Sequence, residues 1–417
     1  MITVTGAPAA REIVGEVGDG VNLFHSIRYN GWSSEYGQAV LAPSTSRIDA
    51  TIAMPEATDS LSLYTPHGFR AGDDRPVLVF IHGGSYQSGS HAEAVNAANL
   101  AAEHGIVVVC IGYRLHVEGF ARFHDDEPNH YRGTDDAVIG LEWVQRNIEA
   151  FGGDPTNVTL MGHSAGAGMA LWITRRDHYR GGFRRVLCCS PAFPRATYED
   201  RKGLLRASLG KPLTREGLEK ASKKTVERGY NRFRRLMSLD VAMGPAPWDP
   251  AELADVPIVL TFTHDEMYDL PACRVPDGKG IGGTTARMLS RSMGMKPGAY
   301  QQWAQAASAI DPEHLTGLLT TDSSILRWVD QTAEGDEHAL WLAQFIGAGE
   351  RRVYHGDELD PLFDGLFSAR LAAYAAGQEP NWPRYTPERA CLDVAITDGS
   401  TAVETDPLAY VRAAFNA

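Results

Sequence analysis

The chain has 417 residues, of which 43% are hydrophobic and 22% charged, as is typical of a globular protein with a sizeable core. Its formal net charge of -13 argues against nucleic acid as a main partner. No apolar run approaches the ~20 residues that a membrane span needs, so we expect no membrane partner.

The cysteines and the N-terminal residues indicate the compartment. The cysteine count is odd and the spacings fit no metal motif, which predicts free thiols in a reducing environment. Residues 1–15 lack the basic region and apolar stretch of a secretory signal. We therefore expect a cytoplasmic protein with no bound metal. The cysteines are Cys110, Cys188, Cys189, Cys273 and Cys391.

The first half of the chain predicts an alternation of strands and helices. Two strands, 11–17 and 21–27, are joined at a turn-forming Asp19-Gly20 pair, which is typical of a hairpin. The segments that follow are strand 76–84, helix 91–105, strand 105–113, helix 135–153, strand 157–163, helix 165–176 and strand 184–190. Such an alternation predicts a mostly parallel sheet with helices on both faces.

The second half adds helical insertions to this sheet. Residues 193–250 and roughly 283–346 have helical patterns, and strand 256–264 lies between them. The segments that follow are strand 351–357, helix 361–377, strand 391–397 and a final helix. We expect one α/β domain over residues 1–417, with cap insertions at about 193–250 and 270–346. Ligands in open α/β sheets bind at the carboxyl edge that such a cap would cover.

The motif Gly162-His163-Ser164-Ala165-Gly166 is the first candidate for chemistry. It follows a predicted strand and precedes a predicted helix, which is the setting of a nucleophile elbow. Small residues must flank the serine because this turn is strained. The helix N-terminus also places free backbone N–H groups beside the hydroxyl. The pattern predicts Ser164 as a nucleophile.

A second motif, His82-Gly83-Gly84-Ser85, follows an earlier apolar strand. Acyl transfer builds negative charge on a carbonyl oxygen, and preorganised backbone N–H groups stabilise it. Glycine allows the backbone to approach a substrate closely. We predict an oxyanion hole made by the N–H groups of Gly84, Ser85 and Ala165.

The acid and the base are expected after the nucleophile, in the order acid then histidine. Asp265 and Glu266 follow the strand 256–264, and His355 ends the predicted strand RRVY. His355 is therefore the best candidate for the general base. Sequence spacing does not choose between Asp265 and Glu266 for the acid.

Several stretches together resemble the type-B carboxylesterases, the family of bacterial para-nitrobenzyl esterases and cholinesterases. They are IHGGSYQSGS, GYRLHVEGF, EWVQRNIEAFGGDPTNVTLMGHSAGAGM, THDE, VYHGDELDPLF and GQEPNWPRYTPERACL, spread from about residue 12 to 412. The resemblance implies an α/β-hydrolase fold. It also implies the triad Ser164, Glu266 and His355, since the family's acid is the glutamate of a D-E-G pattern.

The chain departs from the family pattern at four places. His163 stands where the family usually has glutamate, Ser85 replaces a Gly or Ala, and Met267 replaces the glycine after D-E. Ser60 occupies the position of the family's early cysteine. These changes bear on substrate range, and His163 is a candidate for lining the pocket.

The combined reading predicts a serine carboxylesterase that acts on a small-molecule ester without cofactor or metal. One alternative is an acyltransferase or cyclase of secondary metabolism with the same triad; another is a catalytically silent, esterase-like binding protein. Between Arg195 and Arg235 lie thirteen Lys or Arg residues against five acidic residues. This basic segment is either a solvated helix face or a docking patch for an anionic substrate or an acidic carrier protein.

Overall fold

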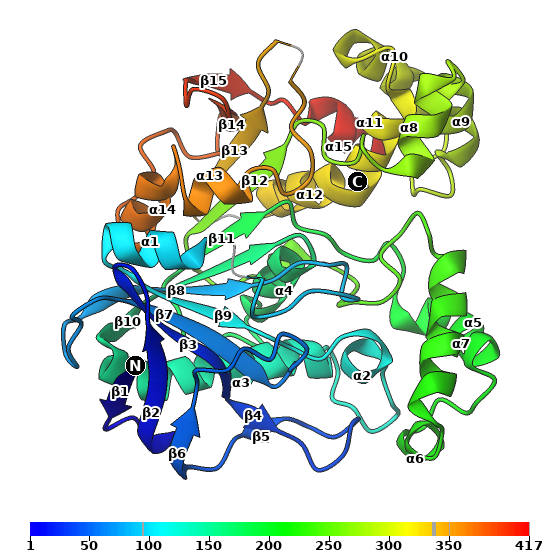
Figure 1. Ribbon diagram of the computed structural model, residues 1–417. Helices are drawn as coiled ribbons and strands as arrows, with labels where there is room; N and C mark the ends of the chain where they lie inside the picture. The colour runs from blue at the N-terminus through cyan, green and yellow to red at the C-terminus, as the bar shows by residue number, and fades with distance from the viewer. Residues whose placement is uncertain (94–95, 336–338, 350, 417) are drawn as a thin grey trace.

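The computed structural model describes residues 1–93, 96–335, 339–349 and 351–416. Its centre is a large mixed sheet with strand order β1-β2-β3-β7-β9-β8-β10-β11-β12-β13-β14-β15, and β6 pairs with β2 (Figure 1). The strands are β1 (Ile2–Thr5), β2 (Ala10–Val17), β3 (Val21–Arg28), β6 (Thr45–Asp49), β7 (Ser60–Pro66), β8 (Arg75–Ile81), β9 (Val107–Ile111), β10 (Gly153–His163), β11 (Arg185–Cys189), β12 (Ile258–Thr263), β13 (Leu340–Ile346), β14 (Ala390–Ala395) and β15 (Thr401–Thr405). A separate pair is formed by β4 (Asn30–Gly31) and β5 (Val40–Leu41).

The predicted mostly parallel core is confirmed. Strands β9, β8 and β10 to β14 run parallel, and antiparallel strands flank them on both sides. Alternate residues of these strands belong to different hydrophobic cores, as the pleat requires. In β8, Val77 and Val79 pack into one core, whereas Leu78 and Phe80 pack into the other.

Helices cover both faces of the sheet (Figure 1). One core holds side chains of α3 and α4, and the other holds side chains of α1 and α14. The helices are α1 (Ala97–His104), α2 (His116–Phe120), α3 (Arg132–Asn147), α4 (Ala165–Ile173), α5 (Tyr198–Leu209), α6 (Arg215–Glu219), α7 (Lys223–Leu236), α8 (Pro271–Gly278), α9 (Gly282–Leu289), α10 (Tyr300–Ile310), α11 (Leu315–Thr321), α12 (Arg327–Gly335), α13 (Leu359–Phe363), α14 (Ser368–Ala375) and α15 (Ala409–Phe415).

The local predictions for the first half hold with small shifts. Strands β2 and β3 form the expected antiparallel hairpin. The helix predicted over 91–105 begins only at Ala97, and residues 94–95 of that prediction lie outside the described residues. The helix predicted over 135–153 is α3 followed by a short 3-10 turn that ends at Gly152, whose φ of 80° is accessible to glycine without strain.

The strand that was predicted to carry the general base, residues 351–357, is wrong. Residues 340–346, assigned to a helical stretch, form β13, which lies between β12 and β14. The described residues of the segment 351–357 form no strand. A short run such as LWLAQFI, which is apolar apart from Gln344, fits a buried helix and a buried parallel strand equally well. Pairing with two neighbouring strands decides in favour of the strand.

Two further groups of helices lie at the side toward which the central strands run (Figure 1). One group is α5 to α7, and the other begins with α8 to α10. These groups fall within the insertions expected at 193–250 and 270–346, and the division into one domain with a cap remains a proposal. Among the described residues, no helix is both long and apolar enough to cross a membrane.

Candidate active site

Ser164 occupies a strained turn between β10 and α4. Its backbone has φ 56° and ψ -121°, a region that L-residues rarely adopt. The flanking glycines permit the turn: a Cβ on Gly162 would lie 2.2 Å from the carbonyl oxygen of Gly166. A Cβ on Gly166 would lie 2.1 Å from the carbonyl oxygen of Ile81. The predicted nucleophile therefore sits in the strand–turn–helix geometry that its motif indicated.

The glycine loop after β8 packs directly against this turn. A Cβ on Gly83 would lie 3.1 Å from the Cβ of Ser164, a tight contact that glycine avoids. The next residues, Gly84 and Ser85, have positive φ values of 100° and 54°. Tyr113 fixes the start of the loop, because its hydroxyl donates to the carbonyl oxygen of His82 at 3.0 Å.

The three N–H groups predicted to form an oxyanion hole are free to donate to a substrate. Within the described part of the chain, the N–H groups of Gly84, Ser85 and Ala165 donate to no protein acceptor. Ala165 is the first residue of α4, where an N–H has no partner within the helix. Their role in binding an oxyanion stays a prediction.

His355 and Glu266 are brought together by two contacts. The Nδ1 of His355 is hydrogen-bonded to the Oε2 of Glu266, and the His355 N–H donates to the Glu266 carbonyl oxygen at 3.0 Å. The other carboxylate oxygen of Glu266 accepts from the Thr263 N–H at 2.8 Å and from the Ser190 hydroxyl at 2.5 Å. The carboxylate is thus buried, fully engaged and aimed at one nitrogen of the imidazole.

Asp265, the alternative acid, faces other partners. Its carboxylate accepts from Arg352 at 2.9 Å and from the Val353 N–H at 3.0 Å, and it contacts His264 at 3.0 Å. The two neighbouring acids therefore point into different surroundings, and only Glu266 contacts His355. The loop that carries His355 follows β13 after several residues, rather than ending a strand as predicted.

His163 lies against the base. Its ring centroid is 4.6 Å from that of His355, and its Nε2 is buried without a hydrogen-bond partner among the described residues. Burial and the neighbouring His355 lower the pKa of His163 well below its usual value. A neutral imidazole therefore lies beside the ring of His355.

The hydroxyl of Ser164 makes no hydrogen bond to His355 in the described structure. Triad hydrogen bonds are often long in free enzymes and tighten when substrate binds. Burial lowers the pKa of His355, but the charge and hydrogen bond of Glu266, together with the charge of Glu358, hold it above its ordinary value. The site can therefore support a base that charges readily beside a fixed carboxylate.

Sequence reasoning missed Ser190 and Glu358. Glu358 is fully buried, and its Oε1 accepts from the Ser190 hydroxyl at 3.3 Å, so that Ser190 lies between two carboxylates. Burial and the charge of Glu266 raise the pKa of Glu358 to about 8. The only signal was the acid three residues after the predicted base, which the motif VYHGDE contains.

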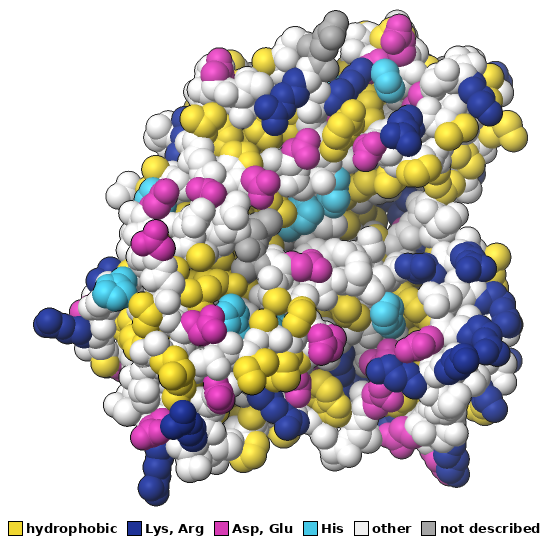
Figure 2. Space-filling view, viewed as in Figure 1, with side chains coloured by type: hydrophobic (Ala, Val, Ile, Leu, Met, Phe, Trp, Pro, Cys, Tyr) yellow, Lys and Arg dark blue, Asp and Glu magenta, His cyan; other side chains and the backbone are white. Residues whose placement is uncertain are grey.

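The basic segment, residues 195–235, includes helices α5 to α7, and most of its side chains are exposed. Figure 2 shows Lys and Arg side chains gathered over these helices. Five of the thirteen cations form ion pairs, for example Arg201 with Asp240 and Arg215 with Asp126. The eight that form no ion pair with a described residue are all exposed: Arg206, Lys211, Lys223, Lys224, Arg228, Arg232, Arg234 and Arg235.

Part of the chain is similar in sequence to known esterases. Residues 42–209 match the model of the carboxylesterase family. Mouse Carboxylesterase 3B is 41% identical over 34% of this chain, and a probable N-octanoylanthranilate hydrolase of Rhodococcus erythropolis is 41% identical over 35%. The chain covers 25% and 34% of the lengths of these two relatives.

The solved structures resemble the whole chain. A PNB esterase superposes with a TM-score of 0.77 at 22% identity, covering 97% of both chains. The Geobacillus stearothermophilus carboxylesterase EST55 superposes with a TM-score of 0.78 at 23% identity, covering 99% of both. These likenesses confirm the predicted fold class, the α/β-hydrolase fold.

Proposed function

We propose that this chain, whose residues 42–209 match the model of the carboxylesterase family, is a serine carboxylesterase that hydrolyses a small-molecule carboxylic ester. One observation carries the proposal: the buried carboxylate of Glu266 is bonded to His355 on the edge of the sheet where Ser164 occupies a strained elbow. A histidine held by a carboxylate near a serine at a strand end suits acyl transfer through a covalent intermediate.

In the proposed mechanism, Ser164 Oγ attacks the ester carbonyl carbon while the Nε2 of His355 takes its proton. Glu266 holds the Nδ1–H of the imidazole and stabilises the charged ring. The N–H groups of Gly84, Ser85 and Ala165 donate to the oxyanion. His355 then returns the proton to the alcohol that leaves. Water, activated by His355, finally cleaves the acyl-enzyme and releases the acid.

The substrate class follows from the site and its setting. His163, whose pKa lies well below its usual value, is a neutral group beside His355. The relatives bear names as different as "Cocaine esterase" and "Juvenile hormone esterase", and those names describe those proteins alone. We propose a neutral or anionic ester, since the basic segment adds positive charge on the cap.

Location and partners are part of the proposal. We propose a cytoplasmic protein, which the five free, buried cysteines support. The eight exposed cations between Arg206 and Arg235 that form no ion pair with a described residue support an anionic partner, such as an anionic substrate or an acidic carrier protein.

Product analysis tests the proposal. A short chromogenic ester is incubated with the wild-type protein and with Ser164→Ala, with and without an added alcohol or amine. We expect the free acid as the main product of the wild type in every reaction. Transfer of most of the acyl group to the added nucleophile would favour the acyltransferase reading, and no turnover at all would favour a silent binding protein.

A further inference from the structure

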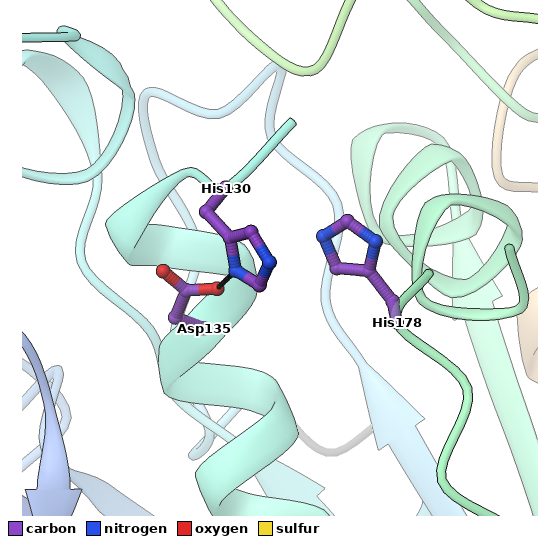
Figure 3. Close-up of side chains that lie close together, drawn as sticks. All are labelled: His130, Asp135 and His178. Atoms are coloured by element: carbon purple, nitrogen blue, oxygen red, sulfur yellow. Dashed lines mark hydrogen bonds and ion pairs between the residues drawn. The ribbon is translucent and has the colours of Figure 1, made fainter. Parts of the chain in front are cut away.

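A second histidine cluster lies outside the proposed active site, between the start of α3 and the segment after α4. It consists of His130, Asp135 and His178, whose potential ligand atoms all lie within 4.8 Å of one another. The ring centroids of the two histidines are 4.5 Å apart. Figure 3 shows the imidazoles facing one another, with Asp135 on the far side of His130. None of these residues takes part in the proposed esterase mechanism.

Both imidazoles are oriented in the same way by a carboxylate. His130 Nδ1 is 2.9 Å from Asp135 Oδ1, and His178 Nδ1 is 2.8 Å from Asp177 Oδ1. An Nδ1–H that donates to a carboxylate leaves the lone pair of Nε2 free. Metal-binding histidines are typically held in this way, because the outer carboxylate fixes the tautomer and increases the basicity of the ligand nitrogen.

One of the two free nitrogens, that of His178, lacks a partner that would explain its burial. His178 is only 3% exposed, and its Nε2 has no hydrogen-bond partner among the described residues. An unpartnered buried polar atom is costly and calls for a ligand. In Figure 3 this nitrogen is on the side of the ring that faces His130. The Nε2 of His130 lies 3.8 Å from a carboxylate oxygen of exposed Glu127, which can swing toward the same point.

We propose that His130 and His178 bind a divalent transition-metal ion of the zinc class through their Nε2 atoms, with Glu127 as a third ligand. Asp135 and Asp177 act as outer carboxylates that orient the two rings. Two imidazoles and a carboxylate suit zinc, with nitrogen distances of about 2.0–2.1 Å, and water completes the coordination. Side-chain shifts are needed for the three ligands to converge on one ion, since the two imidazole rings are stacked at an interplanar angle of 24° and the Nε2 of His130 lies 3.8 Å from the Oε2 of Glu127.

The position of the proposed metal site indicates that a bound ion would stabilise the fold. His130 precedes α3 and His178 follows α4, the helix whose first turn adjoins Ser164. An ion bound to both segments fastens the C-terminal end of α4 to the start of α3. Because the ion binds the folded chain and not the unfolded one, it stabilises the fold by mass action. The proposed esterase chemistry does not pass through it.

Metal binding by the full-length protein is measured after treatment with a chelator and its removal. Zn²⁺ is titrated by calorimetry, the melting temperature is recorded with and without Zn²⁺, and Co²⁺ is added to obtain its d–d absorption spectrum. We expect one ion per chain, a melting temperature several degrees higher with Zn²⁺, and a Co²⁺ spectrum typical of tetrahedral nitrogen and oxygen ligands.

Variants separate this site from adventitious binding. His130→Asn and His178→Asn remove Nε2 but keep a polar group near the position of Nδ1, and we expect each to lose at least 100-fold in affinity. Asp135→Asn should lose 10- to 100-fold as an outer carboxylate. His124→Asn is the matched control, because this histidine lies on the same loop with a 90% exposed side chain.

Two results would overturn the proposal. One is a wild-type protein that shows neither stoichiometric Zn²⁺ binding nor a tetrahedral Co²⁺ spectrum. The other is equal binding by the wild type, His130→Asn and His124→Asn, which would assign the metal to scattered surface groups. His130→Asn decides even if the variant of buried His178 fails to fold, since His130 is partly exposed.

Discussion

Glu266 and His355 are joined twice, once through the carboxylate and the imidazole Nδ1 and once through the backbone, where the His355 N–H donates to the Glu266 carbonyl oxygen at 3.0 Å. The backbone bond ties the loop after β12 to the loop after β13. The orientation of the imidazole is therefore set by the fold as well as by the side-chain contact. A general base requires an imidazole that is held in one orientation, and these two hydrogen bonds hold it.

The nucleophile is tested by Ser164→Ala. We expect turnover of a short ester to fall by up to roughly a millionfold, since a triad acts as a unit. Only one oxygen is lost, so the melting temperature should stay close to that of the wild type. Initial rates and a thermal melt measure the two quantities. Retention of more than a trace of activity would remove Ser164 from the mechanism.

The acid is tested by comparing two neighbouring carboxylates. Glu266→Gln should reduce kcat by about ten-thousandfold, because the amide no longer holds the productive tautomer of His355. Asp265→Asn is the matched control, since its contacts are to Arg352 and Val353. We expect it to affect stability more than kcat. If Asp265→Asn were the more damaging to kcat, the acid would have to be reassigned.

The pH dependence reports the pKa of His355. The base must be neutral to accept a proton, so kcat/KM falls as the pH drops through the pKa of the imidazole. Since the charge and hydrogen bond of Glu266 hold this pKa above its ordinary value, we expect the acid limb to lie above pH ~6.5. Glu358→Gln removes a carboxyl group whose own pKa is raised to about 8, so that it carries little charge at the pH of the limb, and the variant should move the limb only slightly. A large shift of the limb to lower pH would show that Glu358 is ionised while His355 titrates.

A buried carboxyl group should make stability depend on pH. Asp322 accepts from Trp303 Nε1 at 2.7 Å and from the Tyr410 hydroxyl at 3.0 Å, and burial raises its pKa to about 7. The folded state binds this proton more tightly than the unfolded state, so stability falls as pH rises from about 4 to about 7.

Asp322→Asn removes that dependence. Relative to the wild type, the variant should gain about 2 kcal/mol of unfolding free energy between pH 5.5 and pH 8.5, from 1.36 kcal/mol per pKa unit. Denaturant unfolding at both pH values measures the difference. A difference that is the same at both pH values would mean that Asp322 titrates normally.

The basic segment is tested with charge-neutral replacements. Replacing Arg232, Arg234 and Arg235 by Gln should slow turnover of an anionic ester, mainly at low salt, and leave a neutral ester unaffected. A triple variant of Arg11, Arg70 and Arg180, also exposed, is the control for net charge. Equal rates for both esters would identify the segment as an ordinary solvated helix surface.

The sequence predicted the parts of this molecule that depend on local patterns. The β–α alternation and the elbow at Ser164 are encoded by apolar strands and glycines at fixed positions, so they could be read directly. The choice between Asp265 and Glu266 needed the family resemblance, because adjacent residues differ only in where their side chains point.

Other features depended on contacts between distant segments. Strand β13 was mistaken for a helix because its neighbours β12 and β14, which define it, are far away in the chain. The contact of Ser190 with Glu358 joins residues 168 positions apart. The pairing of His130 with His178 likewise arises only when α3 and α4 pack together. No spacing rule would reveal these contacts.

Covalent labelling tests the central claim most directly. The wild-type protein is treated with an aryl phosphonate ester, the course of inactivation is followed, and the modified residue is identified by peptide mass spectrometry. The account predicts one phosphonyl group per chain, attached to Ser164, with activity lost in proportion to labelling. A label on any other residue, or full activity in a protein labelled at Ser164, would contradict it.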